Sequence, residues 1–378
     1  MRRRIIFSNY DDLDNPFYGG GGAAAIHEIA KRLAPRHDVK VLTGKFRGYR
    51  DGNRDDVYYE HIGLAHAGPR LGQIAFHFSL PLHLSRRDFD IWIESLTPPF
   101  STACLQLFTR SPVVLLTQNL PGKSMARKYK LPFHWFESLG LKTYRYGIAL
   151  SDYLRDELLR SNPRMRVAVI PNGVDAALIN QTVHPAPEHI LFLGRIDTEQ
   201  KGLDLLFSAF NRIAKDCSVP LVIAGSGIPR DEELLQKRIQ DLGLGPRVRL
   251  LGKVSGREKK EAFRRALFFV MPSRYEGFPL TLLEAFCWQI PVVLFSIPEL
   301  AWLPSLCCLK IAPFDVAAFA EAMLRLLRDP SLREKMAAAA KQWVRAFSWD
   351  SLATQYENLF AEILETGQIS LSNHERQN

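Results

Sequence analysis

Short apolar segments rich in Val, Ile and Leu alternate with helical segments along this 378-residue chain, and they form two series. The first series includes "RIIFSN", "DVKVLTG", "PVVLLTQ" and "VAVIPNGVD". The second includes "HILFLGRID", "PLVIAGSG", "RVRLLGKV", "LFFVMPS" and "PVVLFS". Strands this apolar, separated by helices, predict parallel sheets that are covered on both faces. We therefore expect an α/β protein of two Rossmann-like domains that face a central cleft.

Turn residues and two prolines interrupt the pattern between Asn172 and His189, where we expect the seam. A chain of this length also fits two domains. The expected divisions are an N-terminal domain at 1–176, a C-terminal domain at 177–348, an amphipathic helix at 349–366 that packs back on the N-terminal domain, and a flexible tail at 367–378.

Composition describes a folded protein with a basic surface. Hydrophobic residues make up 47% and charged residues 24% of the chain, and the formal net charge is +9. This balance excludes fibrous and disordered classes and favours an anionic partner, whether a phosphorylated small molecule, a membrane or a nucleic acid. No apolar run is long enough to span a membrane, and the N-terminus is expected to be a strand rather than a signal peptide.

The cysteines are odd in number and show no C-x-x-C spacing. This pattern predicts buried thiols in a reducing compartment, so we expect a cytoplasmic protein. The five are Cys104, Cys217, Cys287, Cys307 and Cys308.

Four glycines, Gly19 to Gly22, lie between the first predicted strand and the first predicted helix. Glycines let backbone N–H groups approach a ligand closely, and a helix N-terminus favours an anion. The alternative is a flexible connection without a ligand. The loop does not match G-x-G-x-x-G, so a nicotinamide cofactor is not expected.

Two cations follow the strand "HILFL" of the second series. Arg195 and Lys201 flank a loop at the carboxyl end of that strand, where ligands bind in open α/β sheets. An arginine fork and a lysine ammonium there would clamp a diphosphate, whereas isolated surface cations are usually only solvated.

The stretch "EGFPLTLLE" carries a glutamate at each end, Glu276 and Glu284. Backbone N–H groups near Leu280 and Thr281 would be free at the helix start to bind phosphate. An ionised carboxylate only accepts hydrogen bonds, so one glutamate could hold sugar hydroxyls and the other a ribose diol. The alternative is a helix-start acid and an exposed helix residue.

The motifs "PNGVD", "LGRID" with "KG", "IAGSG", "LLGKV" and "MPSRYEGFPLTLLEAF" occur in this order after the N-terminal glycine loop. In this order they resemble the family 4 glycosyltransferases, and the likeness covers nearly the whole chain. The resemblance implies a GT-B fold, a nucleoside-diphosphate sugar donor, retention of anomeric configuration, and no metal or other cofactor.

The resemblance also implies roles for the matching residues. Arg195 and Lys201 would bind the donor diphosphate, Glu276 the transferred sugar, and Glu284 the ribose. Val254 would lie near the base, and the glycine loop near the donor phosphates. The implied catalytic residues are Glu276, Arg195 and Lys201. The implied donor-binding residues are Gly20, Gly21, Gly22, Gln118, Gly194, Arg195, Lys201, Val254, Glu276, Gly277, Phe278, Leu280, Thr281 and Glu284.

One position departs from the family pattern. Many relatives carry a histidine after the strand that corresponds to "PVVLL", whereas this chain has Thr117, Gln118 and Asn119. Gln118 could donate a hydrogen bond to a sugar oxygen but carries no positive charge. This departure leaves the donor, and activity itself, open.

Three histidines in apolar patterns, His27, His77 and His83, are interpreted as packed or solvated side chains rather than catalytic bases. No H-x-x-x-H, D-x-D or acid cluster predicts a metal site. Arginine, lysine and helix dipoles can stabilise a leaving diphosphate without one.

A basic and aromatic segment extends from Lys123 to Arg145. This composition fits peripheral contact with the inner, anionic face of a membrane or a lipid-linked acceptor, and a solvated basic face over packed aromatic residues fits equally well. Stacking on single-stranded nucleic acid is the third alternative and is not expected. The residues are Lys123, Arg127, Lys128, Lys130, Lys142 and Arg145, with Tyr129, Phe133, Trp135 and Phe136.

The resemblance therefore predicts a metal-independent, retaining transferase that moves a sugar from a UDP- or GDP-linked donor to a hydroxyl acceptor. The expected acceptor is a glycan or lipid-linked glycan of cell-envelope or exopolysaccharide synthesis. The alternatives are a nucleotide-sugar epimerase or hydrolase on the same scaffold, and a non-catalytic protein that binds a nucleotide or an anionic polymer.

Overall fold

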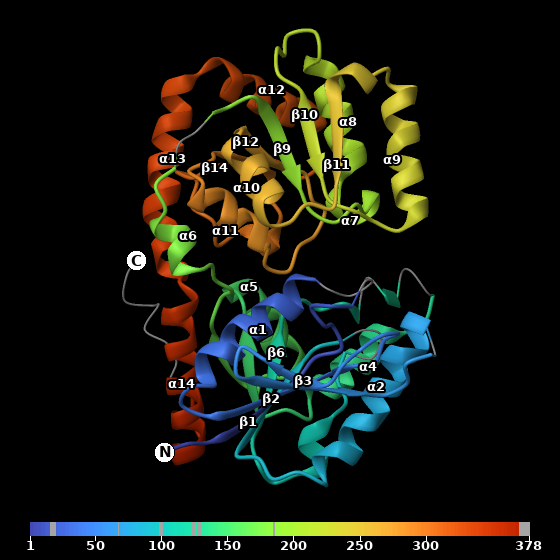
Figure 1. Ribbon diagram of the computed structural model, residues 1–378, viewed down its shortest axis with the longest axis vertical. Coiled ribbons are helices and arrows are strands. Elements are labelled where there is room, and N and C mark those ends of the chain that lie inside the picture. The colour runs from blue at the N-terminus through green and yellow to red at the C-terminus, as the bar shows by residue number, and fades with distance from the viewer. Residues whose placement is uncertain are drawn as a thin grey trace. The chain divides into compact units, whose positions relative to one another are not determined.

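A computed structural model describes residues 1–15, 20–66, 68–97, 101–122, 125–126, 130–183 and 186–369, with the backbone alone at 69 and 70. The chain divides into two compact units (Figure 1). Unit 1 comprises 1–173 and 349–378, and unit 2 comprises 174–348. The boundary lies three residues before the predicted one because the Val174 N–H donates to the Phe347 carbonyl at 2.8 Å, within unit 2.

Unit 1 contains an eight-stranded sheet in the order β3-β4-β2-β1-β5-β6-β7-β8. Every pairing is parallel except that of β3 with β4. The strands are β1 Arg4–Ser8, β2 Asp38–Gly44, β3 Gly52–Arg54, β4 Val57–Ile62, β5 Ile91–Ser95, β6 Val113–Thr117, β7 Tyr146–Ala149 and β8 Arg166–Val169.

The antiparallel pair β3–β4 corrects the prediction of a wholly parallel sheet. Asp55 and Asp56 form a two-residue turn between these strands, with φ values of 49° and 63°. Aspartate tolerates this left-handed conformation better than most residues, and two such residues in a row match a tight hairpin turn. The hairpin adds an edge strand that the apolar pattern did not reveal.

The helices of unit 1 are α1 Gly21–Leu33, α2 Gly68–Leu84, α4 Phe133–Leu141, α5 Asp152–Ser161 and α14 Trp349–Thr366, with a 3₁₀ helix η1 at Leu105–Phe108. The last helix has the bounds expected from its amphipathic pattern, and it packs against α1. Arg32 of α1 and Asp350 of α14 form an ion pair at 2.5 Å.

The flexible tail from residue 367 stays a prediction, and the described part of it, 367–369, begins with Gly367. Its carbonyl accepts hydrogen bonds from the Tyr146 hydroxyl at 2.9 Å and the Arg166 guanidinium at 2.8 Å. Residues 370–378 lie outside the described part of the chain.

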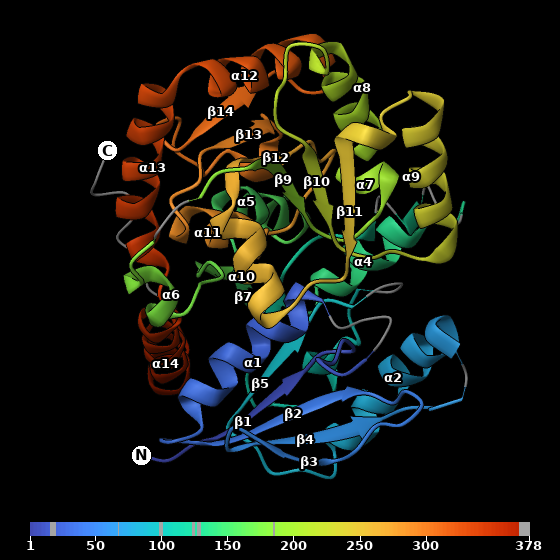
Figure 2. The ribbon, with the colours of Figure 1, turned by 45° about the horizontal axis from the view of Figure 1, so that its top comes forward.

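Unit 2 contains a six-stranded sheet in the order β11-β10-β9-β12-β13-β14, and all of its pairings are parallel (Figure 2). The strands are β9 His189–Leu193, β10 Leu221–Ala224, β11 Val248–Gly252, β12 Ala266–Met271, β13 Val292–Phe295 and β14 Cys308–Ile311. The helices are α6 Ala176–Asn180, α7 Thr198–Lys201, α8 Leu203–Ile213, α9 Pro229–Asp241, α10 Gly256–Arg264, α11 Leu280–Cys287, α12 Val316–Arg328 and α13 Pro330–Val344, with 3₁₀ turns η2 Gly245–Arg247, η3 Pro298–Leu300 and η4 Arg345–Phe347.

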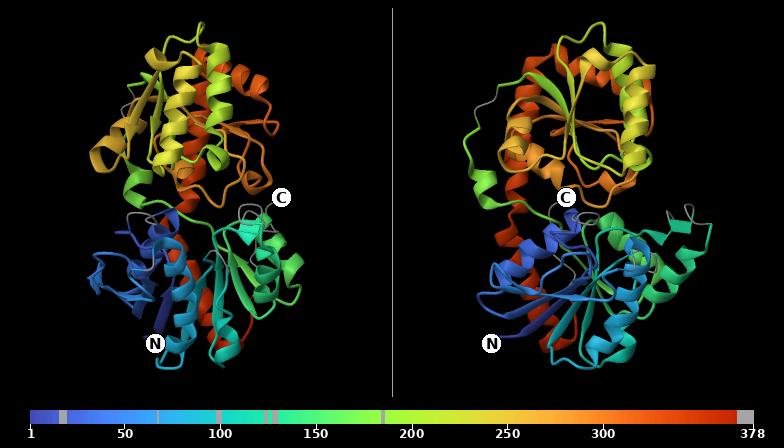
Figure 3. Two further views of the ribbon diagram at one scale, coloured as in Figure 1. Left: turned by 90° about the vertical axis from the view of Figure 1, so that its right-hand side faces the viewer. Right: turned by 45° about the vertical axis from the view of Figure 1, so that its right-hand side comes forward.

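Helices cover both faces of each sheet (Figure 3), which explains why the inner strands are mostly apolar. β5, β6 and β13 are buried at every position. Within the described residues, no helix is long and apolar enough to cross a membrane. All five cysteines are free. Four are buried as predicted, but Cys104 is only half-buried.

In each unit the strand order reverses once beside the first strand. The reversal lies between β1 and β5 in unit 1 and between β9 and β12 in unit 2. Loops that leave neighbouring strands there diverge to opposite faces of the sheet, and a ligand can enter the crevice between them. The topology therefore marks the loops after β1 and β9 as places for a site.

Glu94 is a buried carboxyl group in β5, and its interactions hold a neighbouring loop. It accepts hydrogen bonds from the Ala103 N–H at 2.5 Å and from the Tyr144 hydroxyl. Burial raises the pKa of Glu94 to about 7, although these hydrogen bonds oppose the rise. The native unit therefore favours the protonated carboxyl group.

This raised pKa predicts a specific pH dependence of stability. Between pH 4.5 and 7 the native state binds more protons at Glu94 than the unfolded state, so the free energy of unfolding should fall by up to about 3 kcal/mol as the pH rises through this window, and then level off. Urea unfolding at several pH values measures this change. The Glu94→Gln variant should lack this component, and parallel curves for the two proteins would contradict the prediction.

Candidate functional site

The centre of the candidate site is an ion pair in unit 2. The Lys201 ammonium lies 2.7 and 2.9 Å from the two carboxylate oxygens of Glu276. Lys201 follows β9 and Glu276 follows the adjacent strand β12, so the strand-order reversal brings together residues that are 75 positions apart. Both side chains are largely buried. The structure thus joins two of the predicted catalytic residues.

Local sequence holds each partner in place. The Asp197 carboxylate caps α7 by accepting the Gln200 N–H at 2.8 Å, which fixes the turn that carries Lys201. The Ser273 hydroxyl donates to Glu276 Oε1 at 2.6 Å. Ser273 was not predicted as a site residue, although its position three residues before Glu276 in a loop could have indicated the contact.

A second ion pair connects the two loops. Arg274 donates to both carboxylate oxygens of Asp204 at 2.8 and 2.7 Å. Burial alone would raise the pKa of Asp204, but the Arg274 guanidinium outweighs it and lowers that pKa. Arg274 also donates to the carbonyls of Thr198 and Glu199. The loop after β12 is therefore fixed to α7 and to the start of α8.

Glycines allow these loops to pack without space for side chains. A Cβ on Gly225, whose φ is +145°, would lie 1.8 Å from the Gly194 carbonyl oxygen. A Cβ on Gly202, whose φ is +61°, would lie 2.0 Å from the Pro272 carbonyl oxygen. Both contacts join loops at the carboxyl ends of neighbouring strands.

Several predicted donor-binding residues carry hydrogen-bond donors that have no acceptor in the described part of the chain. α11 starts with Leu280 and Thr281, and within the described chain their N–H groups have no backbone acceptor. Gly277 and Phe278 precede this start. Arg195 is exposed, and its guanidinium has no partner among the described residues. These donors can bind an anion.

Glu284 faces a cation that the sequence analysis did not identify. Lys259 of α10 donates to Glu284 Oε1 at 2.6 Å, while the buried Oε2 lacks a partner among the described residues. That oxygen can accept a hydroxyl hydrogen bond. Val254, half-buried, precedes α10. Because Lys259 and Glu284 are 25 residues apart, nothing in the sequence predicts their contact.

An aromatic stack supports Phe278. Its ring lies parallel to Trp302 with centroids 4.3 Å apart, and Trp302 stacks on Trp343 at 5.4 Å. Glu299, three residues before Trp302, also lies near the site. Burial raises its pKa, and the negative charge of Glu276 adds to the rise. Neither Trp302 nor Glu299 was predicted, because nothing in the motif points to them.

The predicted residues of unit 1 form a second group at the end of β1 and β6. The Gln118 side-chain amide donates to the Gly22 carbonyl at 3.2 Å. A Cβ on Gly22 would come within 3.0 Å of Gln118 Oε1. Gly20 and Gly21 are exposed at the start of α1, whereas Gly19 lies outside the described residues. The structure therefore brings Gln118 against the glycine loop.

Of the three histidines considered from the sequence, two are buried and one lines a pocket. His27 is buried and contacts the Tyr59 hydroxyl at 2.8 Å and Asp55 at 2.9 Å. His77 is buried against the Gln73 carbonyl, and burial lowers its pKa. Both have packed positions, as interpreted from the sequence. His83 lines a separate pocket of unit 1. Among the described residues, no three His, Cys, Asp or Glu side chains form a metal-binding group.

The basic and aromatic segment is only partly described. Lys123, Arg127, Lys128 and Tyr129 lie outside the described residues. On α4, Phe133 is buried, but Trp135 and Phe136 are exposed. The aromatic residues therefore do not all pack beneath a basic surface.

Two family descriptions match most of the chain. Residues 19–178 match "Glycosyltransferase Family 4", and residues 187–329 match "Glycosyl transferases group 1". The chain belongs to the family 4 glycosyltransferases.

Relatives of this glycosyltransferase cover it to different extents. It is 31% identical to an uncharacterized glycosyltransferase of Methanocaldococcus jannaschii. The alignment extends over 237 residues and covers 58% of this chain and 60% of the relative. It is 32% identical to a phosphatidyl-myo-inositol mannosyltransferase of Mycobacterium leprae over 52% of this chain and 54% of the relative. It is 28% identical to an alpha-D-kanosaminyltransferase of Streptomyces kanamyceticus over 96% and 88%. The chain thus spans little more than half the length of the first two relatives, those of Methanocaldococcus jannaschii and Mycobacterium leprae.

Solved structures show the same fold. Sucrose-phosphate synthase from Thermosynechococcus elongatus superposes with a TM-score of 0.81 at 19% identity, covering 96% of this chain and 99% of that one. WaaG, a glycosyltransferase involved in lipopolysaccharide biosynthesis, gives 0.74 at 18% identity, covering 96% and 100%. The glycosyltransferase therefore has the GT-B fold, as predicted.

The close packing at Gly202 predicts a large loss of stability for Gly202→Ala. Alanine there meets both the left-handed backbone and the Pro272 carbonyl, whereas Gly243→Ala meets only the backbone, because φ is +64° and nothing lies within 4 Å. We expect Gly243→Ala to cost about 1 kcal/mol and Gly202→Ala about 1 to 3 kcal/mol more, measured by urea unfolding. Equal losses would show that the contact is not tight.

Proposed function

We propose that this glycosyltransferase moves a sugar from a nucleoside-diphosphate donor to a hydroxyl acceptor with retention of configuration. The observation that carries the proposal is the Lys201–Glu276 pair beside the uncapped start of α11. Cations, free N–H groups and a buried carboxylate meet there at a strand-order reversal, where α/β sheets bind ligands.

The charge that develops during transfer lies mainly on the departing diphosphate. Lys201, Arg195 and the N–H groups of Leu280 and Thr281 would stabilise it, and Arg195 has no partner among the described residues. When phosphate oxygens replace Glu276 as the partner of Lys201, the Glu276 carboxylate can accept hydrogen bonds from hydroxyl groups of the transferred sugar. These groups supply the positive potential themselves, so we propose a reaction without a metal.

The other parts of the donor, its ribose and its base, are assigned to further residues of unit 2. We assign the ribose diol to Glu284, whose Oε2 is unpaired among the described residues, and the base to the loop that holds Val254. Gly194, Gly277 and Phe278 would shape the floor of the site. We also propose that Gly20, Gly21, Gly22 and Gln118 of unit 1 bind the donor.

The proposed donor is a UDP- or GDP-sugar. One structural neighbour, Anabaena Alr3699/HepE, is described in complex with UDP and glucose. The proposed acceptor is a glycan or lipid-linked glycan, in keeping with relatives named for mannosyl transfer to phosphatidyl-myo-inositol.

The decisive experiment is a thermal-shift screen with UDP-, GDP-, ADP- and TDP-sugars, with free nucleoside diphosphates as controls. A selective, concentration-dependent stabilisation supports a donor site and names the base. No shift at millimolar concentration would overturn the transferase proposal. Donor consumption without any acceptor would instead indicate an epimerase or hydrolase.

Arg195→Met should weaken donor binding without affecting the fold, because the Arg195 side chain is exposed and unpaired among the described residues. Loss of a charge-assisted hydrogen bond of about 1.5 to 3 kcal/mol predicts a Kd about 10 to 100 times higher. Calorimetric titration with the selected donor measures this change. The matched control is Arg212→Met, which removes an exposed cation of α8. Equal affinities for both variants would remove Arg195 from the site.

We further propose that α4 contacts an anionic membrane at the inner face of the cell. Trp135, Phe136 and Leu139 are 69%, 53% and 66% exposed, and the cations Lys142 and Arg145 follow them. Aromatic residues beside cations suit a membrane interface. Free thiols at all five cysteines fit the reducing cytoplasm.

Trp135→Ser should therefore weaken binding to phosphatidylglycerol vesicles about 10- to 100-fold, since burial of one large apolar side chain is worth about 1.5 to 3 kcal/mol. Vesicle co-sedimentation measures the bound fraction. Leu306→Ser is the matched control, because Leu306 is 74% exposed in unit 2. An equal bound fraction for the two variants would overturn contact through α4.

A further inference from the structure

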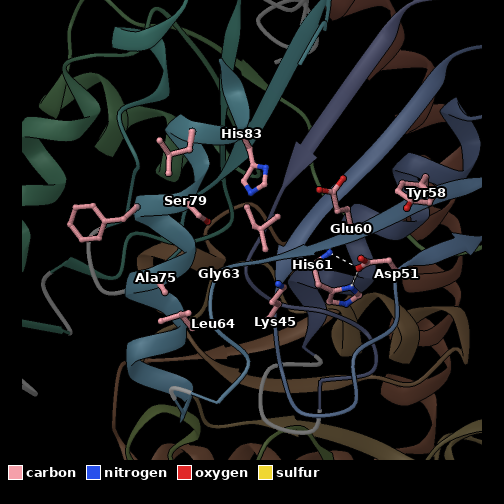
Figure 4. A pocket seen from close by; sticks show the side chains of 13 residues that line it. Lys45, Asp51, Tyr58, Glu60, His61, Gly63, Leu64, Ala75, Ser79 and His83 are labelled. Atoms are coloured by element: carbon pink, nitrogen blue, oxygen red, sulfur yellow. Dashed lines mark hydrogen bonds and ion pairs between the residues drawn. The ribbon is translucent and has the colours of Figure 1, made fainter. Parts of the chain in front are cut away.

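Unit 1 contains a pocket that the donor assignment does not use. It lies between β4 and α2, is open to solvent, has a volume of about 850 Å³ and is lined by residues from β4, α2 and the loop after β2 (Figure 4). This volume is in the range of small-molecule sites. The lining combines polar groups on the strand side with apolar groups on the helix side.

The polar side of the pocket includes a cation, Lys45, that has no carboxylate partner in the described chain. Glu60 is bound by Arg87, and Asp51 accepts the His61 N–H at 2.8 Å and contacts the His61 ring at 2.9 Å. Lys45, in contrast, has no carboxylate within ion-pair distance among the described residues, and its ammonium lies 5.5 Å from the Tyr49 ring centre. The pocket therefore offers an unpaired cation to a ligand.

His83 adds a donor beside this cation. Figure 4 shows the His83 ring and the Lys45 side chain reaching into the space between α2 and β4. Burial lowers the pKa of His83, and the charges of Arg87, Arg86 and Lys45 lower it further. Three cations therefore act on the ring, and Glu60 is the one acid that opposes them. The ring is neutral at pH 7, and its N–H can donate to an anion.

The apolar side is an exposed stripe on α2. Leu71, Ala75, Phe78 and Leu82 follow one another at helical spacing and share one face. Leu71, Phe78 and Leu82 are 60%, 71% and 61% exposed. The stripe is about 16 Å long at 1.5 Å per residue, and Ala75, Phe78 and Leu82 also line the pocket. Such a continuous exposed stripe is typical of a binding surface.

We propose that this pocket binds the acceptor, and that the acceptor is an amphiphile with a phosphate group beside an apolar chain. The phosphate lies against Lys45 and His83, and the chain lies along the α2 stripe. The acceptor role rests on the proposed transferase function, while the class of ligand rests on the pocket alone. A neutral oligosaccharide would leave Lys45 unpaired and the stripe exposed to water.

Dodecyl phosphate, kept below its micelle concentration, is the probe, and calorimetric titration measures its Kd. Dodecyl maltoside tests the chain without the charge. Inorganic phosphate and glucose 1-phosphate test the charge without the chain. We expect dodecyl phosphate to bind at least ten times more tightly than any of these three. If dodecyl maltoside or inorganic phosphate bound as tightly as dodecyl phosphate, the proposal that the ligand is a phosphate-bearing amphiphile would be overturned.

Two variants locate the site, and a third is the control. Lys45→Met and Leu82→Ser should each raise the Kd for dodecyl phosphate about tenfold or more, because both side chains are at least partly exposed and their loss leaves the fold intact. Lys237→Met, an exposed lysine of α9, should leave it unchanged. Equal affinities for all three variants would overturn the pocket as the binding site.

The donor screen separates this inference from the transferase proposal. Lys45→Met should keep the full stabilisation by the selected nucleotide sugar, since Lys45 is outside the donor group. If dodecyl phosphate binds but no nucleotide sugar does, the ligand class stands and the acceptor role is overturned. If nucleotide sugars bind but dodecyl phosphate does not, the transferase stands and the amphiphilic acceptor is overturned.

Discussion

The reversal of strand order between β9 and β12 is the constraint on which the candidate site depends. Because these adjacent parallel strands end at the same edge, the loops that leave them meet, and Lys201 reaches Glu276 across 75 residues of sequence. Other interactions also hold these two loops together. Arg274 ties the same loops through Asp204, and Gly202 has no side chain that would hold its loop away from Pro272. The site is thus a property of topology first and of residue identity second.

The Lys201–Glu276 pair also links the energetics of the site to the proposed chemistry. A largely buried charge is costly unless it is paired, so each side chain keeps the other neutralised while no donor is bound. A diphosphate offers Lys201 more negative charge than Glu276 does. In the proposed reaction this exchange of partners would cost little, because the sugar hydroxyls would supply hydrogen bonds to the Glu276 carboxylate, which also accepts one from Ser273.

Patterns that repeat along the chain were readable from the sequence, and contacts between distant segments were not. Apolar strands and glycine-bearing loops predicted two parallel sheets, and the spacing of the two glutamates placed both on or beside α11. The edge strand β3 was missed because it has only three residues and no apolar side chain. Lys259 and Trp302 were missed because their contacts with Glu284 and Phe278 depend on tertiary packing, for which sequence spacing gives no rule.

The net charge of +9 becomes informative only when the charges that have partners are set aside. Many cations are already neutralised by carboxylates, as Arg274 is by Asp204 and Arg87 by Glu60. Arg195 and Lys45 lack such partners among the described residues, and each lies beside other hydrogen-bond donors at the end of a parallel strand, β9 or β2. An unpaired cation at a strand end needs little reorganisation to accept an anion. Two cations without carboxylate partners in the described chain therefore lie where the two proposed phosphate-bearing substrates would bind, one in each unit.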